Sequence, residues 1–146
     1  GDCVSPLDTN AMINNSNAFL SGIWNYDFIN ERLPGKRAVS DIDGSLERKG
    51  NFLFIETKAT GAGIPTGQLI LYEQLVCTGV ANVLFVYGDT DCPIYYQKMK
   101  KKGNKAVLGE KKSIDAERLA SMVRSWYDWA NRFVVDRTRV WCRCDM

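Results

Sequence analysis

Apolar residues recur along the chain with two different spacings, and the changes between them predict the order of the secondary-structure elements. From about residue 10 to residue 33, apolar side chains lie three or four positions apart, which is typical of amphipathic helix. A Leu-Pro-Gly sequence then ends this helical segment. Residues 38–48 and 51–60 have strand-like composition, and Lys49-Gly50 between them indicates the turn of a β-hairpin.

The second half of the chain places helix and strand patterns around one strongly apolar segment. Residues 80–87 are almost all apolar, which predicts a central strand buried on both faces. The other elements predicted here are a helix over 68–78, strands over 93–99 and 106–108, a lysine-rich turn over 98–105, and a helix over 113–133 capped by Ser113. We therefore expect an α/β fold with a mixed central sheet flanked by helices.

The length of the chain bounds its organisation. It has 146 residues, about the size of one ordinary domain, so we expect a single core without a second module. Its expected parts are an N-terminal helical segment over about 10–33, a core over about 36–110, a C-terminal helix over about 113–133 and a basic tail.

The composition excludes several classes of catalysis and argues against a membrane-spanning segment. The chain contains no histidine, which excludes Ser-His-Asp and Cys-His catalysis and His-ligated zinc. With 19 Lys and Arg against 17 Asp and Glu, the bulk charge does not by itself indicate a nucleic-acid or membrane partner. No apolar run approaches the roughly 18 residues of a membrane span, and we expect no signal peptide. We expect no membrane partner and a reducing, cytoplasmic location.

Charged residues gather where the predicted hairpin should be well buried. If Lys49-Gly50 is the turn, the numbers of each pair of opposed residues add up to 99, so Asp43 lies opposite Glu56 and Asp41 lies opposite Lys58. Opposed carboxylates repel each other unless a cation lies between them. An all-oxygen site without histidine suits Mg²⁺ or Mn²⁺ rather than zinc. The alternative interpretation is a salt-bridge patch on a solvent-facing sheet.

Two motifs in this region resemble the PD-(D/E)xK nuclease superfamily. The Ser-Asp-Ile-Asp sequence at 40–43 followed by Phe-Ile-Glu-Thr-Lys at 54–58 is similar to the acidic residue and the Glu-x-Lys of that superfamily, with Ser40 where proline is common. Gln68 and Tyr72 are similar to the Q-x-x-x-Y helix of its RecB-like and lambda-exonuclease-like members, and they lie one helical turn apart.

The resemblance implies a restriction-endonuclease-like core and a role for each matched residue. It implies metal ligands at Asp41 or Asp43, at Glu56 and at the carbonyl of Thr57, a catalytic lysine at Lys58, and orienting roles for Gln68 and Tyr72. Both aspartates remain candidates, because the following isoleucine favours Asp41 and the pairing favours Asp43. Members of the superfamily often add an acidic residue from the first helix, and Asp27 and Glu31 lie at the right spacing. The implied reaction is Mg²⁺- or Mn²⁺-dependent hydrolysis of DNA, by endonuclease or exonuclease action.

A run of lysines indicates where a polyanion could bind. Between residues 98 and 112 there are seven lysines and one acidic residue. We expect them to contact the phosphate backbone beside the metal site. The residues assigned to this contact are Lys98, Lys100, Lys101, Lys102 and Lys105. The resemblance also implies a phage or mobile-element type of nuclease, which would act in the host cytoplasm, and a homodimer is common among its relatives.

Two other functions are compatible with the pattern. One is a non-catalytic DNA- or protein-binding module on the same fold, such as an accessory protein of a phage or defence system. The other is a nucleotide-cofactor domain, because the Gly-rich segment 61–67 follows a predicted strand and precedes a helix, with Asp89 about 20 residues further on. The Glu-x-Lys near the end of that strand and the proline at position 65 argue against a cofactor domain.

Overall fold

A computed structural model describes residues 23–136 of the chain. The chain divides into two compact units, residues 1–41 and 42–146, and each is described by itself. In the described part of the first unit, the regular element is α2 (Asp27–Asn30), a single helical turn. Residues 10–22 of the predicted helical segment lie outside the described residues, and the described remainder is helical over this one turn. The single-domain organisation stays a prediction.

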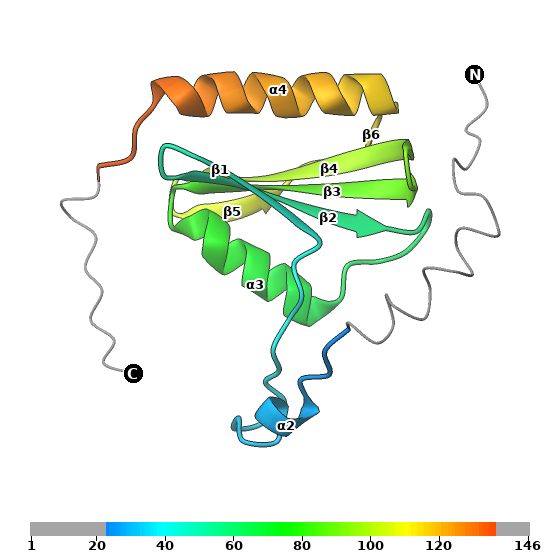
Figure 1. The fold of residues 1–146 in the computed structure, drawn as a ribbon, viewed down its shortest axis with the longest axis vertical. Helices are drawn as coiled ribbons and strands as arrows, with labels where there is room; N and C mark the ends of the chain where they lie inside the picture. The colour runs from blue at the N-terminus through cyan, green and yellow to red at the C-terminus, as the bar shows by residue number, and fades with distance from the viewer. Residues whose placement is uncertain (1–22, 137–146) are drawn as a thin grey trace. The chain divides into compact units, whose positions relative to one another are not determined.

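The second unit is built on a mixed β-sheet (Figure 1). Its elements are β1 (Gly44–Arg48), β2 (Asn51–Lys58), α3 (Thr66–Cys77), β3 (Ala81–Asp89), β4 (Cys92–Lys102), β5 (Lys105–Leu108), β6 (Lys112–Ser113) and α4 (Ala116–Arg132). Strands β1 to β5 lie side by side in chain order, and β6 pairs with β4. The β2–β3 pair is parallel and the other pairs are antiparallel. The predicted α/β class, with a mixed sheet and flanking helices, is confirmed.

The β1–β2 hairpin has the predicted turn and register. Lys49 and Gly50 have φ values of 55° and 87°, and positive φ at both positions is what a type I′ hairpin turn requires. Gly44 pairs with Ile55, so the numbers of paired residues add up to 99 as expected. The strand predicted over 38–48 is nevertheless wrong over 38–43, because β1 begins only at Gly44.

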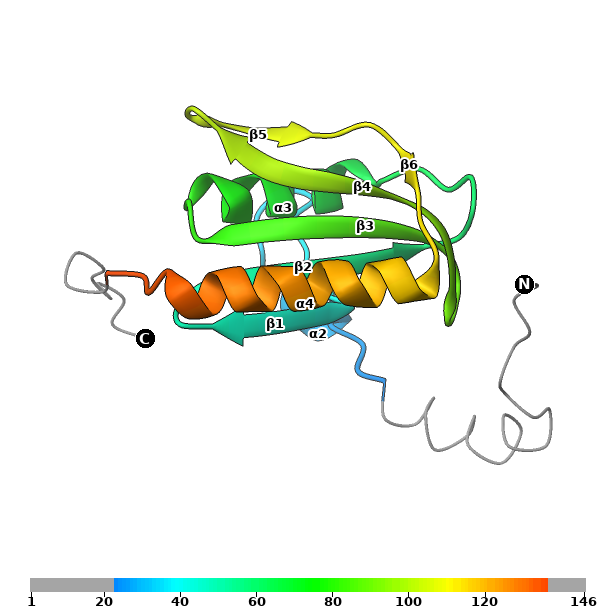
Figure 2. The same ribbon diagram turned by 90° about the horizontal axis from the view of Figure 1, so that it is seen from above.

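The two long helices cover opposite faces of the sheet (Figures 1 and 2). Strand β3 lies in the middle, and its side chains alternate between the two faces. Val83, Phe85 and Tyr87 join the α3-side core, whereas Leu84 and Val86 join the α4-side core. All five are buried, so the prediction of a central strand covered on both faces is confirmed.

Two predicted boundaries in the last third of the chain are wrong. The lysine-rich turn expected over 98–105 is mostly strand, because β4 extends to Lys102 and its pairing with β5 satisfies the backbone there. The cap of the last helix is Asp115 rather than Ser113. The Asp115 carboxylate accepts a 2.8 Å hydrogen bond from the Arg118 N–H, whereas Ser113 pairs in β6.

The described residues also bear on location. No helix among residues 23–136 is long and apolar enough to cross a membrane. Cys77 is a free thiol, whereas Cys92 is disulfide-bonded.

Candidate active site

The candidate site lies where β2 ends, beside the first turns of α3. Strand β2, α3 and β3 form a β-α-β unit, since β2 and β3 are parallel neighbours and α3 joins them. Side chains alternate along a strand, so Glu56 and Lys58 face α3, as Phe54 does, and Thr57 faces the other side. Gln68 and Tyr72 face β2 from α3, one helical turn apart, as the sequence predicts.

Glu56 is a buried carboxyl held by two donors from α3. It is 3% exposed, on a strand whose flanking residues are apolar core. The Tyr72 hydroxyl donates to Glu56 Oε2, and the Gln68 Nε2 amide donates to Oε1 at 2.9 Å. Burial of a charged group costs free energy unless hydrogen bonds compensate it, and each carboxyl oxygen has one such bond here.

Gln68 also holds the lysine of the motif. Its Oε1 accepts a hydrogen bond from Lys58 Nζ, while its Nε2 donates to Glu56. A single amide therefore bridges the ammonium and the carboxyl, and it holds the half-buried Lys58 on the Glu56 side of the sheet. The four residues of the two predicted motifs, Glu56, Lys58, Gln68 and Tyr72, form one continuous hydrogen-bonded set.

Asp43 completes the set from the segment before β1. Its carboxylate accepts hydrogen bonds from the Thr57 N–H at 2.9 Å and from the Thr57 hydroxyl at 3.0 Å. The bond from the Thr57 N–H occupies a backbone donor that a longer β1 could otherwise have used, which explains why the strand starts after Asp43. The carboxyls of Asp43 and Glu56 interact directly and shift each other's pKa.

The surroundings of Asp43 and Glu56 shift the pKa values of the two carboxyls in opposite directions. Partial burial raises the pKa of Asp43, but the two bonds from Thr57, together with the Glu56 carboxyl and the Lys58 charge, outweigh it and hold the pKa below its ordinary value. Burial raises the pKa of Glu56 above its ordinary value, and the Asp43 carboxyl adds to this rise while the Tyr72 hydroxyl opposes it. Neighbouring carboxyls with divergent pKa values are typical of functional sites.

Asp41, Asp27 and Glu31 lie in the first unit, and their contribution to the site stays a prediction. Asp41 lies in the first unit, exposed and outside any strand, so the predicted cross-strand pair of Asp41 and Lys58 is wrong. Asp27 and Glu31 lie in the same unit, at the start of α2 and at its C-cap.

The described residues offer a metal two carboxylates. Among residues 23–136, no three His, Cys, Asp or Glu side chains gather closely enough to hold a metal ion. Asp43 and Glu56 form a pair, and the carbonyl of Thr57, the residue after Glu56, is a further candidate donor. Mg²⁺ is commonly held by one or two carboxylates and keeps several waters, and a carboxylate that accepts one bond per oxygen still has free lone pairs. The donor set therefore fits Mg²⁺ or Mn²⁺ with a water-rich shell.

The predicted lysines lie away from this set. Met99 belongs to the α3-side core and Tyr96 to the α4-side core, so the even-numbered Lys98, Lys100 and Lys102 lie on the α4 face. Along β4, residue 97 pairs with Phe85, the neighbour of Glu56. Lys102 lies five residues further on, which is roughly 17 Å of extended strand. Lys101 lies on the α3 face with its Nζ near Gly79, and Lys105 pairs with Lys102 at the same distant end. Strand β4 thus carries Lys100, Lys101 and Lys102 away from Glu56, and Lys98 lies on the opposite face of the sheet, while the contact of these lysines with a phosphate backbone stays a prediction.

Lys111, which belongs to the seven-lysine run but not to the five residues assigned to phosphate contact, does lie on the α3 face near the site. The ammonium of Lys111 lies over the rings of Tyr87 and Tyr95, 5.2 Å and 4.9 Å from their centroids. Tyr87 is the register partner of Lys58 on the adjacent strand. The available sequence signal is the pair of tyrosines on either side of the β3–β4 turn, but nothing in the sequence places Lys111 over them.

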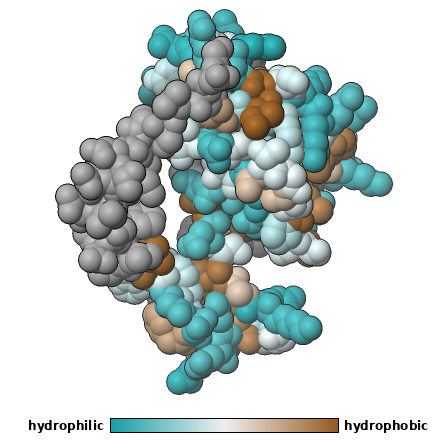
Figure 3. Space-filling view, turned by 90° about the vertical axis from the view of Figure 1, so that its right-hand side faces the viewer, coloured by the Kyte–Doolittle hydropathy of each residue, from teal (hydrophilic) through white to brown (hydrophobic). Residues whose placement is uncertain are grey.

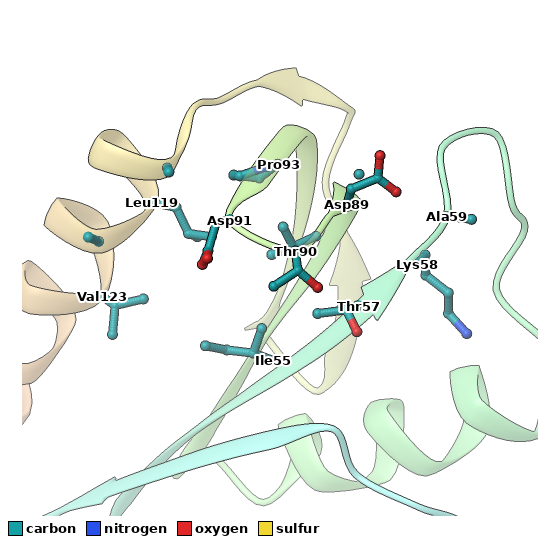
Figure 4. Close-up of a pocket in the computed structure, with 14 residues that line it drawn as sticks. Ile55, Thr57, Lys58, Ala59, Asp89, Thr90, Asp91, Pro93, Leu119 and Val123 are labelled. Atoms are coloured by element: carbon teal, nitrogen blue, oxygen red, sulfur yellow. The ribbon is translucent and has the colours of Figure 1, made fainter. Parts of the chain in front are cut away.

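A separate pocket lies on the opposite face of β2. It has a volume of about 810 Å³ and lies between the ends of β2 and β3 and the start of α4 (Figure 4). Its apolar lining includes Ile55, Val86, Leu119 and Val123. Asp89 and Asp91 are at its edge, and Lys58 points away from it. An apolar pocket edged with carboxylates is poorly suited to phosphate, so we do not count it as part of the candidate site.

The Gly-rich loop differs from a dinucleotide-binding turn. In that fingerprint the strand passes into the helix through a tight glycine turn. Here residues 59–65 separate β2 from α3, and a Cβ added at Gly63 or Gly67 would meet nothing within 4 Å. Neither glycine is required by close packing in this structure.

No family model, curated protein or solved structure matches the chain. The case for any function therefore rests on the chain's own residues and their geometry.

Proposed function

We propose that this protein is a metal-dependent nuclease of the PD-(D/E)xK type that hydrolyses phosphodiester bonds in DNA. The observation that carries the proposal is the hydrogen-bonded set at the end of β2, in which Gln68 links Glu56 to Lys58 and Thr57 links Asp43 to the same strand. A buried carboxyl beside a second carboxyl lowers stability, so a purely structural role would favour its replacement by apolar residues.

Each residue of the set has a defined role in this reaction. Asp43 and Glu56 would hold Mg²⁺ or Mn²⁺ together with the Thr57 carbonyl. When bound, the metal supplies Lewis-acid polarisation of a phosphoryl oxygen and a lowered pKa for coordinated water. The Lys58 ammonium lies beside the carboxyls, where it stabilises the negative charge that develops on the phosphoryl group. Gln68 and Tyr72 keep Glu56 and Lys58 in place through their hydrogen bonds.

The surface around the site suits a polar substrate. In Figure 3, the described surface on the side toward which β2 points is a mixture of hydrophilic and intermediate side chains, with hydrophobic side chains in separate patches. Such a surface favours a charged strand over an apolar partner. The restriction-endonuclease-like core is part of the same proposal, and the hairpin, helix and parallel strand at residues 44–89 are the elements that support it.

The same fold without catalysis is the second candidate. The observation in its favour is that the described residues bring together two carboxyls rather than three. A non-catalytic module would bind nucleic acid without cleaving it, so cleavage distinguishes the two functions.

The test is a cleavage assay on linear, circular and single-stranded DNA with Mg²⁺ or Mn²⁺ and with a chelator. We expect metal-dependent cleavage that falls by about 100-fold or more in Glu56→Gln and in Lys58→Met, because each change removes a group that acts on the developing charge. Glu110→Gln and Lys112→Met are matched controls, since both residues are exposed and lie outside β2 and α3, Glu110 between β5 and β6 and Lys112 in β6. Both controls should cleave at the wild-type rate.

A second measurement separates loss of metal binding from loss of folding. Mg²⁺ should raise the free energy of unfolding of the wild type in urea, by about 2.7 kcal/mol at 100 times its Kd, and should have no such effect on Glu56→Gln. Cleavage that survives chelation, cleavage that is equal in all variants, or a wild type that cleaves none of the substrates would each refute the proposed function.

A further inference from the structure

The segment that joins β5 to β6 is held against the sheet near the end of β3. Gly109 N–H donates to the Lys98 carbonyl at 2.8 Å, and the Gly109 carbonyl accepts from Gln97 Nε2 at 3.0 Å. Gln97 Oε1 in turn accepts from the Tyr87 hydroxyl at 2.7 Å. These bonds fix the backbone two residues before Lys111, so the course of the chain there is determined by the sheet and not by Lys111 itself.

Lys111 lies over a pair of stacked tyrosines. The rings of Tyr87 and Tyr95 have centroids 4.6 Å apart and an interplanar angle of 28°. The Lys111 ammonium is 5.2 Å and 4.9 Å from these two centroids, within the range of cation–π attraction. No carboxylate of the described residues forms an ion pair with Lys111, and its side chain is exposed. The ammonium is thus positioned by aromatic rings while its charge remains available.

The tyrosine pair continues directly from the candidate active site. Lys58 pairs with Tyr87, and Tyr87 pairs with Tyr95, so the three residues form a row across neighbouring strands on the α3 face. Neighbouring strands lie about 4.8 Å apart, so the row spans roughly 10 Å. At its far end, the Tyr95 hydroxyl accepts a 3.0 Å hydrogen bond from Gly61 N–H, which attaches the loop after β2 to the same row.

We propose that Lys111, held over Tyr87 and Tyr95, binds a backbone phosphate of the nucleic acid next to the phosphate at Glu56 and Lys58. This inference rests on the proposed function and names a binding site for its substrate. A strand that leaves the catalytic set along the row meets a second ammonium roughly two strand spacings from Lys58. The Tyr95 hydroxyl accepts from Gly61, and its own hydrogen can donate to the same phosphate.

Lys112 provides an unusually close control. It pairs with Tyr96, whose side chain is on the α4 face, so Lys112 lies on the opposite face of the sheet from Lys111. The two lysines are adjacent in the chain, both are exposed, and neither forms an ion pair with a described residue. The same substitution at both positions therefore changes the net charge equally and differs only in the face of the sheet.

The test measures binding of a fluorescent DNA duplex by anisotropy, in chelator, at several salt concentrations between 50 and 200 mM. For Lys111→Gln we expect weaker binding and a slope of log K against log salt that is smaller in magnitude by about 0.9, the value for one lost phosphate contact. Its deficit relative to wild type should accordingly be about threefold larger at 50 mM than at 200 mM. Lys111→Arg should restore the slope, and Lys112→Gln should match the wild type.

The outcomes separate this inference from the proposed function. If Lys111→Gln binds as the wild type does, or if Lys112→Gln loses as much, or if the wild type binds no duplex, the Lys111 site is refuted. Cleavage by the wild type in the same preparation would leave the nuclease function standing even then. Conversely, a Lys111-specific loss of binding in a protein that cleaves no DNA with either metal would support the phosphate site and refute the nuclease.

Discussion

The hydroxyl of Tyr72 connects α3 to the buried carboxyl of Glu56, and its removal measures how firmly the site is held. Tyr72 is fully buried, and its hydroxyl donates to Glu56. Its ring packs edge-on against Phe85 and at an angle against Phe54, with centroids 5.5 Å and 6.3 Å away. Tyr72→Phe keeps these ring contacts and removes only the hydroxyl, so the change in stability reports the hydrogen bond.

The expected magnitude follows from the kind of acceptor. A hydrogen bond to a charged group contributes about 1.5–3 kcal/mol, and one between neutral groups about 0.5–1.5 kcal/mol. Without Tyr72, the Glu56 carboxyl keeps the Gln68 amide, at 2.9 Å, as a donor. We therefore expect Tyr72→Phe to lower the free energy of unfolding by about 2 kcal/mol. Tyr87→Phe, which removes a bond to the neutral Gln97 amide, should cost about 1 kcal/mol.

The assay is urea unfolding at pH 7 in chelator, followed by circular dichroism, for both single variants and for Glu56→Gln with and without Tyr72→Phe. The double-mutant cycle should show a coupling of about 1–2 kcal/mol between Tyr72 and Glu56. The reasoning is refuted if Tyr72→Phe costs no more than Tyr87→Phe, or if the effects at Tyr72 and Glu56 simply add.

Two further predictions concern the backbone and a lysine outside the site. Gly88 has a φ of 142°, and a Cβ there would lie 3.0 Å from backbone atoms of Pro93 and Ile94. Gly88→Ala should therefore lower the free energy of unfolding in urea by about 2 kcal/mol or more. Gly63→Ala is the control, because a Cβ at Gly63 meets open space, and it should change the free energy of unfolding by less than about 0.5 kcal/mol. Burial, with the Lys100 charge, lowers the pKa of Lys98 in the folded protein below 10.5. Between that lowered pKa and 10.5 the unfolded chain binds more protons than the folded protein, so the wild type gains stability as pH rises through this window. At pH 7 the unfavourable charge is fully present, so Lys98→Met should raise the Tm, and this gain should shrink as pH approaches 10.5; a constant gain would contradict the cause.

Local rules account for most of the fold. The I′ turn at Lys49 and Gly50 determines the hairpin register, and the continuous apolar run determines the doubly covered strand β3. The boundaries that sequence misses depend on contacts between distant residues. Strand β1 starts late because Asp43 bonds to Thr57, fourteen positions away, and β4 continues through its lysines because β5 pairs with them. Neither contact has a local signature.

The candidate site also has some parts that the sequence predicts and others that it does not. Period-two alternation brings Glu56 and Lys58 to one face, and one helical turn separates Gln68 from Tyr72, so the sequence predicts their convergence once β2 and α3 are known to be neighbours. The hairpin register predicts Asp43 near Glu56, but its bonds to Thr57, from a position before β1, are not predicted. Lys111 is part of the predicted lysine run, but its position over Tyr87 and Tyr95 cannot be predicted, because it depends on how Gln97 and the β4 backbone hold the segment before it.

The near-neutral net charge of the chain hides an uneven distribution of its lysines. A run that is continuous in sequence is split by strand alternation between two faces of the sheet, and none of its lysines forms an ion pair with a described residue. Lys111 contacts the rings of Tyr87 and Tyr95, but most of the other lysines lie far from the candidate site. If a nucleic acid binds at the end of β2, its salt dependence should reflect the few cations on the α3 face there, Lys58 and Lys111, and not the whole run. A slope near the value for seven phosphate contacts would instead indicate that the substrate also covers the α4 face, where Lys98, Lys100 and Lys102 lie.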